Sequence, residues 1–216
     1  MNIKQIYSQT MKSNIIQFEK FKLKTDKNVF SPREDIEIFP RALKKIIKNK
    51  NQILELGTGT GAISISLAKH FNNINILATD INSSALKIAK HNAMLNKVDN
   101  IIEFKKSNWF LNLEKRKFDF IVSNPPYLSK KNYSHYKELT DPDNSLYSKN
   151  DGLYDIYKII KYGVNYLKHD SYMLIEHSHN QTLCVKNFSK QFGLRLLKTE
   201  KDILGFNRVS IFSNRV

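Results

Sequence analysis

The chain has 216 residues, of which 41% are apolar and 11% aromatic, a composition typical of a globular protein with one ordinary domain and at most a small extension. A single cysteine excludes an internal disulfide framework and any multi-cysteine metal site. The first residues lack the apolar stretch of a secretory signal, and no apolar run approaches the ~18 residues of a membrane span. We therefore expect a cytoplasmic protein that does not associate with membranes.

The formal net charge of +15 raises the question of nucleic-acid binding. Only six of the 35 basic residues are arginine, and the lysines are spread along the whole chain rather than clustered among aromatic residues. The densest basic runs, residues 44–50 and 115–117, fall where elements are expected to end. We interpret the charge as a solvated surface, and we expect any contact with nucleic acid to be indirect.

The N-terminal part of the chain is predicted to be separate from the main domain. Phe18, Phe21 and Leu23, followed by residues 28–30, predict a short hairpin. A helix is expected from Arg33 or Glu34 to Ile47, with Ser31 or a nearby residue capping it and Pro32 marking its start. We divide the chain into a short N-terminal segment, residues 1–30, and one main domain, residues 31–216.

From residue 52 onward, short apolar runs alternate with helical patterns, which predicts βαβ units, a mostly parallel sheet and helices on both of its faces. The last two strands are joined without a helix, so they have to be antiparallel. One stretch, residues 127–151, has no clear period and is expected to be a lid or binding loop. The predicted strands are 52–56, 75–79, 101–105, 118–122, 171–176, 194–199 and 208–212, and the predicted helices are 62–70, 83–96, 152–167 and 179–191.

A glycine-rich turn joins the first of these strands to a helix. Gly57, Gly59 and Gly61 lie in this turn, where the missing Cβ atoms allow tight bends and the close approach of a ligand. Asp80 follows 19 residues after Gly61, at the end of the next strand, where a carboxylate can accept hydrogen bonds from ribose hydroxyls. The pattern predicts a nucleotide cofactor, nicotinamide, flavin or adenosyl, although a tight turn that binds nothing is the alternative.

The tetrapeptide Asn124-Pro125-Pro126-Tyr127 follows the strand at 118–122, so we expect it at the same edge of the sheet. The two prolines fix the backbone, which leaves rigid carbonyl acceptors. The side-chain oxygen of Asn124 and the carbonyl of Pro125 can accept both hydrogens of a planar amine, and Tyr127 can cover its flat face. This arrangement suits methyl transfer to nitrogen, in which positioning supplies most of the gain. The alternative is a loop that the prolines merely stiffen.

Residues 55–62, Asp80 and residues 124–127 together resemble class I S-adenosylmethionine-dependent methyltransferases that act on planar nitrogen. Further blocks are similar to those of the release-factor glutamine methyltransferases, the PrmC/HemK family, in order from about Phe18 to the end of the chain. These blocks are residues 31–37, 107–110, 141–146, 151–153 and 201–209, together with Glu176 and Gln181.

The resemblance implies a doubly wound α/β fold with a mostly parallel, seven-stranded Rossmann-like sheet and a C-terminal antiparallel strand. It implies methyl transfer from S-adenosylmethionine to the glutamine amide nitrogen in the Gly-Gly-Gln motif of class I peptide chain release factors, by a monomeric enzyme without a metal. The implied cofactor-binding residues are Gly57, Thr58, Gly59, Thr60 and Gly61 at the methionine part, Asp80 at the ribose, Asn108 and Trp109 near the adenine, and Asn124. The implied substrate-binding residues are Asn124, Pro125, Pro126 and Tyr127, of which Asn124, Pro125 and Tyr127 are catalytic.

Two departures from the family pattern affect these expectations. Asn108 stands where the family usually has aspartate, so an acceptor for the adenine amine remains but carries no charge. Family members have a helical domain of several dozen residues before the hairpin, whereas about 17 residues precede Phe18 here. We therefore expect the release factor to be recognised more weakly or differently, while the chemistry persists.

Two other functions remain open from the residues. The tetrapeptide at 124–127 would hold an adenine or guanine amine equally well, which fits a nucleic-acid amino-group methyltransferase, although the blocks at 151–153 and 201–209 favour the protein substrate. A non-catalytic cofactor-binding protein is the third reading. His177, His179 and Cys184 are not interpreted as metal ligands, because no second cysteine or suitably spaced carboxylate accompanies them.

Overall fold

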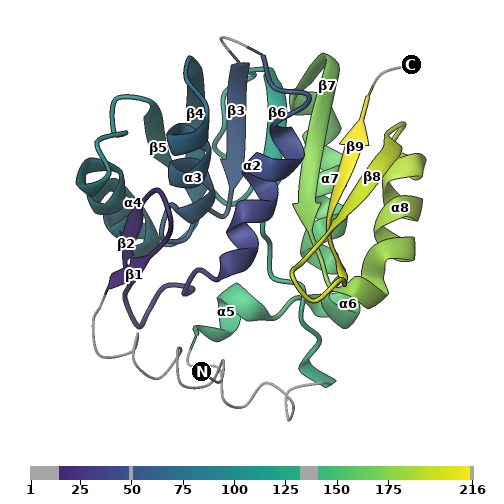
Figure 1. The fold of residues 1–216 in the computed structure, drawn as a ribbon. Coiled ribbons are helices and arrows are strands. Elements are labelled where there is room, and N and C mark those ends of the chain that lie inside the picture. The colour runs from purple at the N-terminus through teal and green to yellow at the C-terminus, as the bar shows by residue number, and fades with distance from the viewer. Residues whose placement is uncertain (1–14, 49–50, 132–140, 215–216) are drawn as a thin grey trace.

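The computed structural model describes residues 15–48, 51–131 and 141–214. A seven-stranded sheet with the order β5-β4-β3-β6-β7-β9-β8 forms the centre, and a two-stranded sheet, β1-β2, lies beside it (Figure 1). The strands are β1 (Ile15–Gln17), β2 (Lys22–Lys24), β3 (Asn51–Leu56), β4 (Ile74–Asp80), β5 (Ile102–Lys106), β6 (Phe118–Ser123), β7 (Leu167–Glu176), β8 (Arg195–Lys201) and β9 (Asn207–Ser213). The helices are η1 (Glu34–Glu37), α2 (Ile38–Leu43), α3 (Ala62–His70), α4 (Ser83–Leu95), α5 (Asp143–Leu146), α6 (Lys149–Gly152), α7 (Tyr154–Gly163), η3 (Val164–Tyr166), η4 (His179–Gln181) and α8 (Thr182–Gln191).

The direction of the strands confirms the predicted fold class. Strands β5, β4, β3, β6 and β7 run parallel to their neighbours, and β9 pairs antiparallel with both β7 and β8. Apolar side chains fill the central strands on both faces, which is the pattern of a parallel sheet covered by helices. The carboxyl ends of five parallel strands therefore meet at one edge of the sheet.

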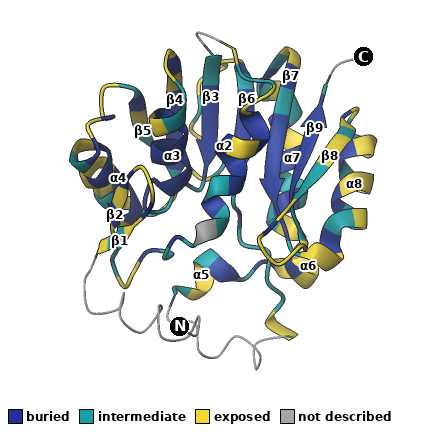
Figure 2. Cartoon of the chain, viewed as in Figure 1, coloured by how far each residue is buried: buried dark blue, intermediate teal, exposed yellow. Residues whose placement is uncertain are grey.

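Each face of the sheet has its own core. Helices α2, α3 and α4 cover one face, and side chains such as Phe39, Ile65 and Phe120 are buried there. Helices α7 and α8 cover the other face, with Ile159 and Phe212 among the buried residues. Figure 2 shows the central strands in the colour of buried residues, between helices with exposed outer surfaces. This burial of both faces holds the strand ends, and the loops that follow them, in place.

A hairpin is present in the N-terminal segment, but its strands are 15–17 and 22–24. Phe18 and Phe21 lie in the turn between them, and residues 28–30 form no strand. Two asparagines hold the hairpin, Asn92 in α4 and Asn96 at the C-cap of the same helix. Asn92 accepts from the Lys24 amide at 2.7 Å and donates to the Lys24 carbonyl at 2.9 Å, and Asn96 forms the same pair of bonds with Lys22. These reciprocal bonds satisfy backbone groups that would otherwise have no partner in the short β2 strand. The division of the chain after residue 30 stays a prediction.

The helix expected from residue 33 or 34 to residue 47 is wrong in its extent. The structure has the 3-10 turn η1, then α2, which ends at Leu43, and a turn in which both Ile46 and Ile47 donate to the Leu43 carbonyl. Pro40 lacks an N–H and is tolerated in the first turn of α2, so one continuous helix from residue 33 cannot form. Ser31 is not the cap, because the N-cap position of η1 is Arg33 and no side chain caps this end. The Ser31 amide donates to Asp141.

The segment predicted to lack regular structure, residues 127–151, contains the short helices α5 and α6, and residues 132–140 of it lie outside the described residues. The helix expected at 152–167 begins at Tyr154, because Gly152 has a left-handed φ of +85° that ends α6. Its last predicted residue, Leu167, begins β7 instead. The helix expected at 179–191 starts with a 3-10 turn and continues as α8. The strand expected at 171–176 is present but begins four residues earlier, at Leu167. The remaining strand and helix predictions are confirmed to within one or two residues.

Candidate active site

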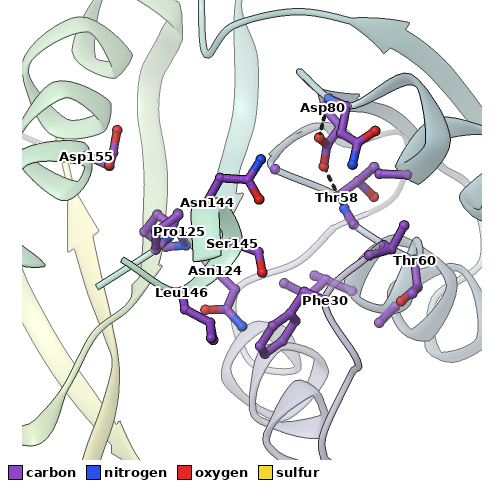
Figure 3. Close-up of a pocket in the computed structure, with 18 of the residues that line it drawn as sticks. Phe30, Thr58, Thr60, Asp80, Asn124, Pro125, Asn144, Ser145, Leu146 and Asp155 are labelled. Atoms are coloured by element: carbon purple, nitrogen blue, oxygen red, sulfur yellow. Dashed lines mark hydrogen bonds between the residues drawn. The ribbon is translucent and has the colours of Figure 1, made fainter. Parts of the chain in front are cut away.

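The loops at the carboxyl edge of the sheet enclose a cavity of about 520 Å³. Gly59, from the turn after β3, and Asn124, from the turn after β6, both line it, which confirms the expectation that these two turns meet. Figure 3 shows Asp80 and Thr58 on one side of the cavity and Asn124 and Pro125 on the other. Of the predicted site residues, those that line it are Gly57, Thr58, Gly59, Thr60, Asp80, Asn108, Trp109, Asn124, Pro125, Pro126 and Tyr127.

Gly61 is the predicted site residue that does not line the cavity. Its φ is +84°, and a Cβ there would lie 3.2 Å from the side chains of Ala89 and Ile65, so this glycine lets α3 pack closely against α4. Gly59 differs, because a Cβ on it would meet no atom within 4 Å although its φ is +56°. The turn therefore leaves open space above Gly59, where a ligand can approach the backbone.

Asp80 ends β4 and connects this strand to the glycine turn. Its Oδ2 accepts a hydrogen bond from the Gly59 amide at 2.9 Å, and its Oδ1 accepts from the Asn82 amide at 2.8 Å. Burial raises the pKa of Asp80, and the two backbone donors act in the opposite direction. Each oxygen has a further lone pair, so the carboxylate can still accept hydrogen bonds from ligand hydroxyls in the cavity.

Beneath the glycine turn lies a buried carboxyl group, Glu55, that the sequence did not identify as functional. Its Oε2 accepts from Thr58 Oγ1 at 2.7 Å and from both the amide and the hydroxyl of Ser64, while its Oε1 has no hydrogen-bond partner within the described residues. Burial, reinforced by the nearby charge of Asp80, raises the pKa of Glu55 to about 7. The available signal was a charged residue inside the apolar run of β3.

The indole of Trp109 forms part of the wall next to the glycine turn. Its ring lies 3.5 Å from the position that a Cβ on Gly57 would occupy, which is an ordinary contact, so a glycine is favoured there by its φ of +72° and not by lack of space. Trp109 Nε1 donates to Asp155 Oδ1 at 3.1 Å, and the other oxygen of Asp155 accepts from Ser148 Oγ at 2.6 Å. Asp155 comes from α7, far away in sequence, and nothing in the helical pattern of that segment distinguishes it as a site residue.

The turn at 124–127 is held by residues from two distant segments. Gln181 Nε2 donates to the Tyr127 carbonyl at 2.9 Å and to the Asp151 carbonyl at 3.1 Å. A Cβ on Gly152 would collide with the Tyr127 carbonyl, so a glycine is required where the two backbones touch. Asn124 makes no side-chain hydrogen bond within the described residues, and its amide therefore remains available to a ligand in the cavity.

A second buried carboxyl group, Glu176, supports Tyr127. The Tyr127 hydroxyl donates to Glu176 Oε1 at 3.0 Å, and Oε2 has no partner within the described part of the chain. Burial and the neighbouring Asp35 raise the pKa of Glu176 to about 7, with the charges of Arg208 and Arg33 acting in the opposite direction. Burial and the Glu176 carboxylate likewise raise the pKa of the Tyr127 hydroxyl, which therefore stays protonated and acts as a donor.

The histidines set aside by the sequence have other partners. His177 Nδ1 lies 2.8 Å from the Ser178 carbonyl oxygen and its Nε2 lies 2.7 Å from Ser210 Oγ. Over residues 15–48, 51–131 and 141–214, no group of three His, Cys, Asp or Glu side chains is arranged to hold a metal ion. The same ranges contain no helix with the length and apolar character needed to cross a membrane.

Known proteins with similar sequences match most of the chain. A family model described as "Methyltransferase small domain" matches residues 20–141. A release factor glutamine methyltransferase from Aliivibrio fischeri is 34% identical over 200 residues, which are 90% of this chain and 70% of that protein. The chain belongs to the release factor glutamine methyltransferase family within the small-domain methyltransferases.

The identity is higher with a second member of this family. The release factor glutamine methyltransferase of Buchnera aphidicola (subspecies Acyrthosiphon pisum) is 42% identical over 183 residues, which are 83% of this chain and 65% of that protein. The chain thus spans about two thirds of the length of these two relatives. This membership confirms the resemblance seen in the sequence blocks.

Solved structures place the fold among methyltransferases as well. The ribosomal protein L11 methylase of Lactobacillus delbrueckii subsp. bulgaricus aligns with a TM-score of 0.68, over 89% of this chain and 84% of that chain, at 16% sequence identity. At this identity the likeness concerns the fold alone. It confirms the Rossmann-like sheet.

Proposed function

We propose that this protein transfers a methyl group from S-adenosylmethionine to the side-chain amide nitrogen of the glutamine in the Gly-Gly-Gln motif of class I peptide chain release factors. The observation that carries the proposal is the shared cavity of Gly59 and Asn124, in a chain of the release factor glutamine methyltransferase family. The first residue belongs to a turn suited to the methyl donor, and the second to a turn suited to a planar amide.

The residues present suit S-adenosylmethionine. The open space above Gly59 admits a group that any side chain would displace, and Asp80 offers carboxylate oxygens of the kind that bind ribose hydroxyls. Trp109 supplies an aromatic wall for the adenine, and Asn108 can accept from its amine. Residues 57–60 would hold the methionine part. When bound, the cofactor supplies an electrophilic methyl group on a sulfonium sulfur.

Asn124 and Pro125 would orient the glutamine amide. The Asn124 side-chain oxygen and the Pro125 carbonyl accept its two hydrogens, which favours the positive charge that develops on the nitrogen as it attacks. Pro126 keeps the backbone rigid, and Tyr127, held by Glu176, covers one face of the amide. The proton leaves the nitrogen after attack, so no charged base is required next to it.

The proposed partner is a translation factor, and we extend the proposal to a cytoplasmic setting and a monomeric enzyme. The nucleic-acid alternative is not favoured, because the two relatives described above are named release factor glutamine methyltransferases. The net charge of +15 motivated that alternative, but it does not by itself select a substrate.

The test is an assay of methyl transfer. The protein is incubated with S-adenosylmethionine and a class I release factor, and mass spectrometry is expected to find one added methyl group on the Gly-Gly-Gln glutamine. A release factor with that glutamine replaced by alanine is the matched control and should gain none. Structured RNA and DNA are supplied in parallel. Methyl transfer to nucleic acid, with none on the release factor, would overturn the proposal.

A further inference from the structure

The turn between β8 and β9 exposes three large apolar side chains. Ile203, Leu204 and Phe206 are 73%, 70% and 47% exposed, whereas most apolar side chains of β9 are buried. The tip between Asp202 and Arg208 carries no charged residue, although a quarter of the chain is charged. Figure 1 places this turn at the same end of the sheet as α5 and α6, and Figure 2 shows it as exposed. An apolar patch at a loop tip is typical of an interaction surface.

Asp202 holds this turn in one conformation. Its Oδ1 accepts from the amides of Leu204 and Phe206 at 3.0 and 2.9 Å, and its own amide donates to the Phe206 carbonyl at 2.9 Å. Gly205 has a φ of +86°, which closes the loop. Because these bonds order the backbone in advance, an apolar partner can bind the tip at a small cost in conformational entropy.

The same turn is connected to the wall of the active-site cavity. Arg208 lines the cavity and donates to Asp202 Oδ2 through two nitrogens, at 3.2 and 2.8 Å. His179 also lines the cavity, and its ring lies 5.0 Å from the ring of Phe206. The exposed tip is therefore continuous with the rim of the site, on the side of the residues that hold Tyr127.

We propose that Ile203, Leu204 and Phe206 form a docking surface for the release factor itself, beside the glutamine that enters the cavity. This inference rests on the proposed function and names the part of the chain that recognises the protein partner. A glutamine at the tip of a loop can reach Asn124 only if the protein surface next to it lies against the rim. The uncharged tip predicts that the contacting surface of the release factor is apolar.

The experiment compares two variants of the full chain. The first is the double variant Ile203→Gln, Leu204→Gln, which replaces exposed side chains and leaves Asp202, Gly205 and Arg208 unchanged. The matched control is Met94→Gln, because Met94 is 60% exposed on α4, at the opposite side of the sheet. KM and kcat are measured with an intact release factor and with a short Gly-Gly-Gln peptide, and release-factor binding is measured directly without methyl transfer.

The double variant is expected to raise KM for the release factor about 10-fold and to weaken direct binding equally, with kcat and peptide methylation unchanged. The control should resemble the unmodified protein. Unchanged binding of the release factor by the double variant would overturn the proposal. This holds also if the double variant loses self-association, because the apolar tip would then bind a second copy of the chain and not the release factor. Failure of the unmodified protein to methylate the release factor would count against the proposed function, while the binding measurement would still decide the docking surface.

Discussion

The two turns that meet at the cavity are built in different ways. The glycine turn is supported by Glu55, whose donors Thr58 and Ser64 lie three and nine residues away. The Asn124 turn is supported by Glu176, which is 49 residues from its donor Tyr127, and by Gln181, which is 54 residues away. Each turn rests on a buried glutamate with one oxygen unpartnered in the described chain. The glycine turn is thus supported by residues close to it in sequence. The Asn124 turn is supported by residues that only the folded chain brings near it.

Because the two turns are supported differently, substitutions near each turn should affect different functions. A locally supported turn can form as soon as β3 and α3 pack, so changes near it should affect cofactor binding alone. A turn assembled from three distant segments depends on the packing of β7, α6 and η4, so changes far from residue 124 should reach the substrate amide. Four predictions, taken from the largest effect to the smallest, test this contrast.

The largest effect is expected for Asn124→Ala. The variant loses an acceptor for the glutamine amide but no structural bond within the described residues, so turnover should fall about 10³-fold while the fold and cofactor affinity are kept. Methylation kinetics and calorimetric titration of S-adenosylmethionine measure the two quantities. Asn187→Ala, on the exposed side of α8, is the control and should behave as the unmodified protein. Normal turnover of the Asn124 variant would refute its assigned role.

Gly152→Ala should destabilise the protein by about 3 kcal/mol and disturb the Asn124 turn. Its Cβ would strike the Tyr127 carbonyl and lie 2.7 Å from Gln181 Nε2, at a residue whose φ is +85°. The control is Gly193→Ala, where φ is +78° but no atom lies within 4 Å of the new Cβ, so that about 1 kcal/mol of backbone strain is expected alone. Urea denaturation measures both. Equal losses would mean that the contact with Tyr127 has no importance.

The buried glutamates predict a dependence of stability on pH. Because Glu55 and Glu176 have folded pKa values of about 7 against 4.5 for the ordinary carboxyl group, the folded state binds more protons between these values. The contribution of the two glutamates to the free energy of unfolding should therefore be highest below pH 4.5. It should fall by about 1–3 kcal/mol per group as the pH rises to 7.

Glutamine variants assign this pH dependence to its two sources. Glu55→Gln and Glu176→Gln should each flatten the pH profile of stability, whereas Glu114→Gln, whose side chain is 88% exposed, should not. If the local and distant supports differ as described, Glu55→Gln alters cofactor affinity and Glu176→Gln alters turnover. A pH profile that neither variant changes would contradict the raised pKa values.

The smallest effect is expected for Asp80→Asn. The amide cannot reproduce the charged acceptor, so affinity for S-adenosylmethionine should fall about 10-fold, while turnover at saturating cofactor stays near normal. The control Asp99→Asn changes an exposed carboxylate and should leave the affinity unchanged. Isothermal titration measures the affinity. An unchanged affinity would remove Asp80 from the cofactor site.

Prediction from the sequence was accurate where periodicity and turn chemistry agreed. The helix at 62–70 has the predicted ends, and the strands around it are correct to within a residue or two. Glycines mark the end of the first strand and the start of the helix, and apolar periodicity marks the other limits. The helix predicted up to Ile47 was wrong in its extent, because the regular helix ends at Leu43 and only a turn follows, in which the Ile46 and Ile47 amides share the Leu43 carbonyl. A helical spacing of apolar residues indicates that they are buried on one face, and such burial does not require an unbroken helix.

The partners that complete the site were less predictable. Asp155 lies in an ordinary helical pattern, and Arg208 reaches the cavity only because β9 pairs antiparallel with β7. No spacing in the chain relates these residues to Trp109 or Tyr127. Their contribution follows from strand order, which is a property of the whole sheet.

The amino-acid sequence alone therefore established the alternating α/β fold, the family and the two turns at the sheet edge, because glycine, proline and apolar periodicity act over a few residues. Tertiary structure decided which carboxyl groups are buried under those turns, which glutamine holds the second turn and where the apolar β8–β9 tip lies. Burial and long-range hydrogen bonds depend on what packs against a residue, and only the assembled sheet brings those groups together.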